Sequence, residues 1–203
     1  MTHSTHSKIL EAIEGSRKGS LLFPSDFVEI GNADAIRATF SRLAKDGTLR
    51  RLAQGIYLYP KEDALLGTLQ PSLEDIAEAI AKRDKVRIMP TGSSALNKLG
   101  LSTQVPMKMV YLTDGKPKKI KIGKSLLTFK PAAPKKLAMK GKISSLVIQA
   151  LEELGHKVIK DEKTISRITE LLQKEDKKII KQDAKLAPAW IARLIYSITE
   201  KMK

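Results

Sequence analysis

Cysteine is absent from this 203-residue sequence, and histidine and tryptophan are rare, with three and one residues respectively. Without cysteine the chain has no disulfide, no thiolate metal ligand and no cysteine nucleophile, which fits a reducing compartment. No histidine or carboxylate pair has the spacing of metal ligands. We therefore expect no metal and no other cofactor.

Long apolar runs are also missing. Uncharged stretches such as residues 53–60 and 88–97 reach about ten residues, whereas a helix needs roughly 18 to span a bilayer. The first residues lack the apolar stretch of a signal peptide. These absences favour a cytoplasmic protein that does not associate with membranes.

Acidic residues are scarce in one part of the chain. The net charge is +15, and residues 85–142 contain 14 Lys and Arg against the single acid Asp114. Such a concentration attracts polyanions, although a basic surface can also serve solubility alone. The lysines around one predicted hairpin are the expected phosphate contacts, namely Lys116, Lys118, Lys119, Lys121 and Lys124.

The apolar spacing predicts three helices and a hairpin in residues 1–62. Ser25 and Asn32 stand where helix N-caps are expected, and Gly47 stands where the third helix should end. The expected helices are residues 5–14, 26–30 and 33–46, and the expected strands are residues 48–52 and 56–59. That order of elements is typical of a winged helix-turn-helix domain.

After a predicted linker at residues 60–71, the pattern changes to a basic mixed α/β domain that ends in helices. The domain boundary is expected between residues 62 and 63, and the fold class is α+β. The expected helices are residues 72–82, 95–99, 143–154, 165–172, 179–180 and 188–198, and the expected strands are residues 85–89, 107–112, 118–122 and 125–130.

The third predicted helix has the two faces that a recognition helix needs. Ile36, Phe40 and Leu43 share one face and should pack in the core. The opposite arc carries Asp34, Arg37, Ala38, Ser41, Arg42 and Lys45. The planar fork of an arginine matches the two acceptors of a guanine edge, so Arg37 is the predicted base contact. An ordinary solvated helix face is the alternative.

The predicted hairpin supplies further contacts. Arg50, Arg51 and Gln54 lie on or beside it, where a wing touches phosphates or the minor groove. With Ser25 and Asn32 at the helix starts, these side chains complete the set that we expect to contact double-stranded DNA.

Residues 42–57 read Arg-Leu-Ala-Lys-Asp-Gly-Thr-Leu-Arg-Arg-Leu-Ala-Gln-Gly-Ile-Tyr. This segment resembles the N-terminal winged helix of AbiEi-type antitoxins, the antitoxin half of type IV toxin–antitoxin pairs. Thr91-Gly-Ser-Ser94 and Tyr111-Leu-Thr-Asp-Gly115 also look like that family. The sequence departs from the family at Gln54, where a basic residue is expected.

The resemblance implies an autorepressor that binds its own promoter through the winged helix. It also implies that the C-terminal domain neutralises a nucleotidyltransferase-like toxin, the cognate partner protein. Residues 89–113 contain no acidic side chain that could hold the metal of such an enzyme. We therefore expect the chain to be neither the toxin nor a nuclease, and to have no catalytic residues.

Two features and two functions stay open. Thr91-Gly-Ser-Ser94 can bind a phosphate at a helix N-terminus, or Thr91 or Ser93 can simply cap that helix. The helix around Trp190 can be a partner surface or a core helix. The alternatives to a repressor–antitoxin are a stand-alone transcription regulator and an RNA-binding protein that uses residues 85–142. Base stacking there would depend on Tyr111 and Phe129.

Overall fold

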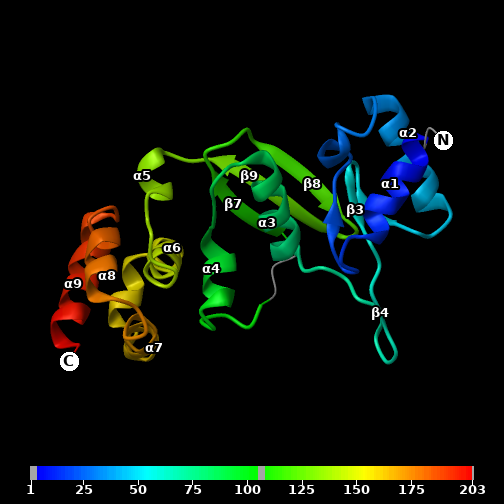
Figure 1. The fold of residues 1–203 in the computed structure, drawn as a ribbon. Helices are drawn as coiled ribbons and strands as arrows, with labels where there is room; N and C mark the ends of the chain where they lie inside the picture. The colour runs from blue at the N-terminus through cyan, green and yellow to red at the C-terminus, as the bar shows by residue number, and fades with distance from the viewer. Residues whose placement is uncertain (1–3, 105–107, 203) are drawn as a thin grey trace. The chain divides into compact units, whose positions relative to one another are not determined.

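The protein is a mixed α+β chain, which confirms the α+β part of the predicted fold class. The computed structural model describes residues 4–104 and 108–202 (Figure 1). Its contacts separate two compact units. One comprises the residues up to Asp84 with residues 121–124, and the other comprises residues 85–120 with the residues from Ser125 onward. The first unit thus extends past residue 62 and includes the helix that follows the expected linker.

The N-terminal unit contains short helices and small antiparallel sheets. Its elements are α1 (Thr5–Glu14), β1 (Leu21–Leu22), the 3₁₀ helix η1 (Pro24–Phe27), α2 (Ala33–Lys45), β2 (Arg50–Ala53), β3 (Ile56–Leu58), β4 (Glu62–Asp63), β5 (Gly67–Thr68) and α3 (Leu73–Asp84). Strand β3 lies between β1 and β2, antiparallel to both. The helices predicted at residues 5–14 and 33–46 and the hairpin after them are confirmed.

A small aromatic cluster joins the elements of this unit. The Phe40 ring from α2 lies edge-on to Phe27 of η1, with centroids 5.1 Å apart, and 5.0 Å from the Tyr57 ring of β3. Ile9 and Ile13 of α1 are fully buried in the same core. Aromatic pairs at these distances are stabilising beyond the area that they bury, so η1, α2 and β3 are held in fixed relation.

Two local predictions for this unit were wrong. Ser25 does not cap a helix, because η1 begins one residue earlier at Pro24, whose fixed φ suits a first helical position. The expected linker at residues 60–71 contains the β4–β5 hairpin, whose turn is closed by Asp63 accepting from the amides of Leu65 and Leu66 at 2.9 and 3.0 Å. The apolar tip of this hairpin is exposed, 94% and 77% for the two leucines.

The C-terminal unit begins with a four-stranded sheet. Its elements are β6 (Ile88–Pro90), α4 (Gly92–Lys98), β7 (Lys108–Thr113), β8 (Lys118–Ile122), β9 (Ser125–Pro131), α5 (Pro134–Leu137), α6 (Ser144–Leu154), η2 (His156–Lys160), α7 (Glu162–Leu172), α8 (Lys177–Ala184) and α9 (Ala189–Lys201). The strand order is β6-β7-β9-β8, with β7 and β9 parallel, so β8 is an edge strand; its last two residues, 121 and 122, are among those assigned to the first unit. Met107, predicted to open β7, lies outside the described residues.

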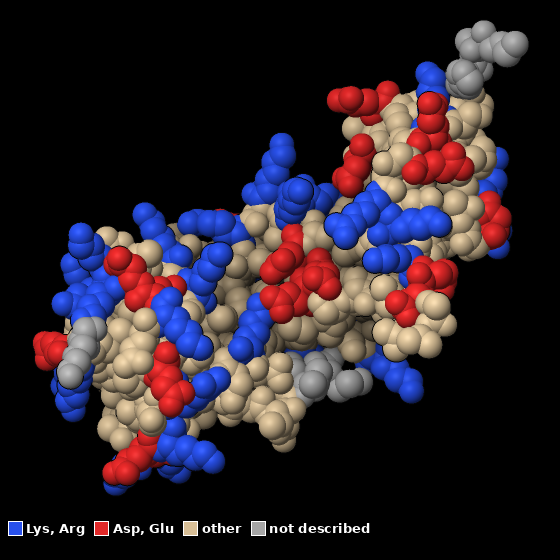
Figure 2. All heavy atoms as spheres, turned by 60° about the horizontal axis from the view of Figure 1, so that its bottom comes forward, with Lys and Arg blue, Asp and Glu red and all other residues tan. Residues whose placement is uncertain are grey.

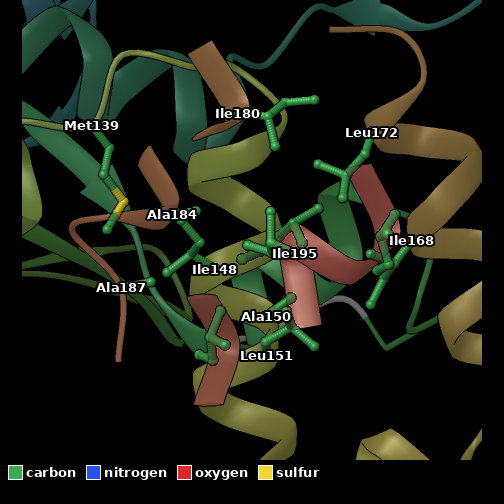
Figure 3. Packing of buried hydrophobic residues seen from close by; sticks show 14 of the residues in the cluster. Met139, Ile148, Ala150, Leu151, Ile168, Leu172, Ile180, Ala184, Ala187 and Ile195 are labelled. Carbon is green, nitrogen blue, oxygen red and sulfur yellow. The ribbon is translucent and has the colours of Figure 1, made fainter. Parts of the chain in front are cut away.

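The helices of this unit enclose its main core. Figure 3 shows apolar side chains from α6, α7, α8 and α9 pointing toward one another. Ile148 of α6, Ile168 of α7 and Ile195 of α9 are fully buried there. This confirms the apolar stripes predicted at residues 143–154 and 188–198, except at Leu154, the last member of the first stripe, which is 37% exposed at the end of α6.

A buried carboxylate fixes the start of α6. Asp183 of α8 is 1% exposed and accepts hydrogen bonds from the Lys140 and Gly141 amides, both at 2.9 Å, and from the Ser144 hydroxyl at 2.7 Å. Glu175 accepts from the Ser144 amide (2.7 Å) and from the amide before it (2.9 Å). A Cβ at Gly141 would collide with the side-chain oxygens of Ser144, Glu175 and Asp183, so a larger residue here would displace the groups that hold the start of α6.

Within the described residues, no helix has both the length and the apolar character that a bilayer span requires. The same residues contain no group of three or more His, Asp or Glu side chains that could bind a metal ion.

Candidate nucleic-acid interface

A groove of about 560 Å³ runs between η1, α2 and the β2–β3 hairpin. It brings together four of the side chains that the sequence predicted to contact DNA, Ser25, Arg37, Arg51 and Gln54. The remaining lining residues are Pro24, Val28, Ala33, Ile36, Gly55, Tyr57 and Arg83. Residues from three helices (η1, α2 and α3) and a hairpin therefore meet on one surface of the N-terminal unit.

The register of the hairpin decides which arginine faces this groove. Arg51 pairs with Tyr57 across the β2–β3 ladder, and Arg50 pairs with Leu58. Because paired residues project on the same face of a sheet and successive residues on opposite faces, Arg51 shares the groove with Tyr57, whereas Arg50 projects on the other side. The two adjacent arginines, predicted as one cluster, are thus separated.

The turn of the hairpin presents Gln54 beside Arg51. Gly55 has a φ of 70°, a conformation that residues with a Cβ rarely adopt. The ladder shifts register between Arg51 and Ala53, and such bulges re-aim side chains next to binding sites.

On α2, the predicted division of faces is confirmed. Ile36, Phe40 and Leu43 are at most 2% exposed, whereas the polar and basic side chains of the opposite arc are exposed. The exposed side chains predicted to contact DNA are Arg37, Ser41, Arg42 and Lys45.

The exposed face of α2 has an internal order. Arg37, Ser41 and Lys45 are spaced by four and form one row along the helix. Arg42 lies roughly 140° around the helix axis from Arg37 at about 100° per residue. The row adjoins the groove at Arg37, so Arg42 would reach a bound polyanion from a different side.

An ion pair orients Arg37. Its Nη2 lies 2.6 Å from Oδ1 of Asp34, one turn earlier, and the two side chains are 67% and 93% exposed. A pair with this exposure contributes little to stability. Arg37 can therefore leave Asp34 and form a stronger bidentate contact with a ligand at a small cost in free energy.

A side-chain cap holds the start of α2, and a hydrogen-bonded aspartate holds the turn after its end. Asn32 accepts from the Ala35 amide at 2.8 Å, which confirms it as the N-cap. Because the side-chain oxygen of Asn32 is engaged in this cap, a contact from Asn32 to DNA would use its side-chain nitrogen, Nδ2. At the other end, hydrogen bonds from the amide and side chain of Thr48 hold the pKa of the Asp46 carboxyl below its usual range, and this fixes the turn into β2.

The predicted basic hairpin lysines do not share one face. In β8, Lys119 and Lys121 are exposed, whereas Lys118 alternates with them and is half-buried on the side of Ile120. Lys116 is exposed in the turn before β8. Figure 2 shows Lys and Arg side chains spread over much of the face that it draws, with smaller groups of acidic side chains between them.

The other candidate features of the C-terminal unit are structural. Tyr111 and Phe129 are 2% and 3% exposed and stack on each other with centroids 6.1 Å apart. Thr91 occupies the N-cap position of α4, but its hydroxyl donates to the carbonyl of Val110 instead of capping the helix. Trp190 packs against the helical core of Figure 3, in agreement with a core helix.

Sequence reasoning missed one charged residue of the groove. Arg83 stands in the last turn of α3, and its guanidinium lies 4.5 Å from the centre of the Phe23 ring. In the sequence, a cation at a helix C-terminus indicates only a favourable dipole interaction. To predict Arg83 as part of the groove, one would need to know that α3 lies beside Phe23, the residue that precedes η1.

The fold and this site thus define an α+β protein whose N-terminal unit presents a groove lined by three arginines. The chain belongs to the family described as "Family of unknown function (DUF6088)", whose profile matches residues 8–180. A search of curated proteins found no match to the chain.

Proposed function

We propose that the N-terminal unit is a winged helix-turn-helix that binds double-stranded DNA, with α2 as the recognition helix and the β2–β3 hairpin as the wing. The observation that carries this proposal is the groove that joins Arg37 of α2 to Arg51 and Gln54 of the hairpin. The order of helix, helix and hairpin agrees with it. So does the exposed row on α2, since one face of a recognition helix must pack while the other presents donors.

In this arrangement α2 enters the major groove, which is about 12 Å wide. Arg37, early in the helix, reads a base edge, and Ser41 and Lys45 continue along the same row. Arg42 and the wing residues Arg51 and Gln54 contact the backbone, where cations and amides fix the register of a protein on its site. Arg50, on the other face of the hairpin, is positioned for a separate phosphate.

We further propose that the chain is a cytoplasmic autorepressor and antitoxin that acts on its own promoter and neutralises a nucleotidyltransferase-like toxin. The support is the resemblance of residues 42–57 to AbiEi-type antitoxins. A stand-alone winged-helix regulator without a toxin is the alternative. RNA binding is disfavoured, because Tyr111 and Phe129 are buried and cannot stack on bases.

The DNA proposal is tested with Arg37→Ala, Arg42→Ala and the control Lys8→Ala, an exposed cation of α1 that does not line the groove. Binding to the promoter fragment is measured against salt concentration. Loss of Arg37 should cost about 1–3 kcal/mol and relax sequence preference. Loss of Arg42 should weaken all sequences alike and reduce the salt slope by about one unit.

Wild-type affinity in both variants, with binding by the control also unchanged, would show that α2 does not read DNA. The antitoxin proposal is tested separately by coexpression with the product of the neighbouring gene, scored as rescue of growth. The Arg37→Ala protein should still rescue, because the resemblance assigns neutralisation to the C-terminal unit. Failure of both the wild type and the variant would favour the stand-alone regulator.

A further inference from the structure

A second groove lies on the N-terminal unit, with a volume of about 800 Å³. It runs between the loop that enters β1, the segment around Leu69 and the last turns of α3. Its lining includes five cationic side chains and two carboxylates, namely Arg17, Lys18, Lys61, Lys82, Arg83, Asp26 and Asp75. This concentration of positive charge lies within a unit whose sequence up to residue 60 is nearly balanced, with 8 basic and 6 acidic residues.

The carboxylates of the groove are engaged locally. Asp75 accepts hydrogen bonds from the amide and the hydroxyl of Ser72 at 2.9 and 2.6 Å, which caps α3. Asp26 accepts from the hydroxyl of Ser25 at 3.4 Å. Arg17, Lys18, Lys61 and Lys82 are exposed. Five cations against two carboxylates give the lining a net charge of +3, and four of the five cations are exposed.

Arg83 gives the groove a fixed element. Its side chain is 23% exposed and is held by the Asp84 carboxylate at 2.9 Å and by the face of the Phe23 ring. Unlike the four lysine and arginine side chains around it, this guanidinium is positioned before any ligand arrives. A pre-positioned arginine loses less conformational freedom when it forms hydrogen bonds to an anion.

Arg83 also borders the first groove, between α2 and the hairpin. The 3₁₀ helix η1 separates the two hollows, with Ser25 in the first and Asp26 in the second. Arg83 is thus the cation that the two grooves share, and a polyanion seated on Arg37 and Arg51 would have Arg83 beside it at the border of the second groove.

We propose that the second groove binds phosphate groups. Two sources share this chemistry. One is the DNA backbone flanking the site that α2 contacts, which rests on the proposed function. The other is a free phosphate-bearing ligand such as a nucleotide, whose size suits a pocket of several hundred Å³. Lysines suit either source, because an ammonium binds phosphate as a point charge.

The test compares the full-length wild type with the double variant Lys18→Gln/Lys82→Gln and with the control Lys174→Gln/Lys178→Gln. The control pair lies in the C-terminal unit, is exposed and removes the same charge. Binding of inorganic tripolyphosphate is measured by calorimetry at low salt, and binding of a promoter duplex is measured as a function of salt. Circular dichroism checks that all three proteins are folded.

Loss of about tenfold in tripolyphosphate affinity in the groove variant alone supports the site for a free ligand. A fall of about two units in the duplex salt slope, again in the groove variant alone, supports the DNA backbone as the source. If the wild type binds no duplex, the proposed function fails. The tripolyphosphate measurement alone then decides whether the second groove binds phosphate groups. Equal behaviour of the groove and control variants in every measurement that shows binding would overturn the proposal.

Discussion

Asp183→Ala should destabilise the C-terminal unit far more than the loss of a surface carboxylate would. Asp183 is 1% exposed and accepts three hydrogen bonds, from two amides and the hydroxyl of Ser144. Alanine removes every acceptor at once. The two backbone donors, on Lys140 and Gly141, cannot turn away, because the chain around them is fixed by the start of α6.

The magnitude follows from the two buried donors that lose their acceptor, the Gly141 amide and the Ser144 hydroxyl, since the Lys140 amide is only partly buried. A buried donor left without a partner costs about 1–3 kcal/mol, so two cost about 2–6 kcal/mol. The variant no longer has to desolvate a carboxylate, which offsets part of that loss. We expect a net destabilisation of about 2–4 kcal/mol, or roughly 5–15 °C in Tm for a protein of this size. Asp183→Asn should fall between the wild type and the alanine variant, since one acceptor oxygen remains.

The assay is thermal and urea unfolding, with hydrogen exchange of the Gly141 amide as the local readout. Glu200→Ala is the control, because Glu200 is an exposed carboxylate of α9 and should change stability by no more than about 0.5 kcal/mol. Exchange at Gly141 should accelerate only in the Asp183 variants. An Asp183→Ala protein within 1 kcal/mol of the wild type, with Gly141 still protected, would refute the hydrogen-bond reasoning.

Two further predictions concern the edge strand β8 and the ion pair of Arg87 with Asp114. Lys119→Gln/Lys121→Gln, which removes the exposed lysines from one face of β8, should reduce the salt slope of DNA binding by about two units without changing the preferred site; an unchanged slope would assign this charge to another partner. For acid stability, the Arg87 guanidinium, with Nε 2.8 Å from Oδ2, and the Arg87 amide hold the pKa of Asp114 below its ordinary value of 3.8. A lowered pKa stabilises the fold above the ordinary value and ceases to do so as pH falls through the lowered one. The Tm difference between wild type and Asp114→Asn should therefore be present at neutral pH and vanish in acid, and a gap that is constant with pH would contradict this.

Helices with strong apolar periodicity were predictable. The stripe through Ile36, Phe40 and Leu43 and the stripe through residues 143–154 both lie in cores, because burial of one face decides helical structure more than any single residue does. Caps were predictable where the side chain is local, as at Asn32. Ser25 failed as a cap because the proline before it already satisfies the first position of η1.

Features that depend on contacts between distant residues were not predictable. The sequence places Arg50 and Arg51 together, and only the pairing with β3 shows that they face opposite ways. The three lysines of β8 likewise divide between two faces once the residues form a strand. Arg83 comes from a helix whose position no local pattern reveals. Asp183 reads as one more acid in a charged segment, since its three partners lie 39 to 43 residues away.

The groove of the N-terminal unit separates the residues that support it from those that would contact a ligand. Phe27 and Phe40 are buried behind it, Tyr57 is a mostly buried part of its lining, and the three rings set the spacing of η1, α2 and β3. Truncating any of them would cost about 3–5 kcal/mol and move the whole surface. Arg37 and Arg51 are exposed, and their removal leaves that spacing intact. Loss of binding in an Arg37 or Arg51 variant that keeps its Tm would therefore report on contacts made by the side chain itself. The same loss in a Phe40 variant would report only that the helix and the hairpin must be held together.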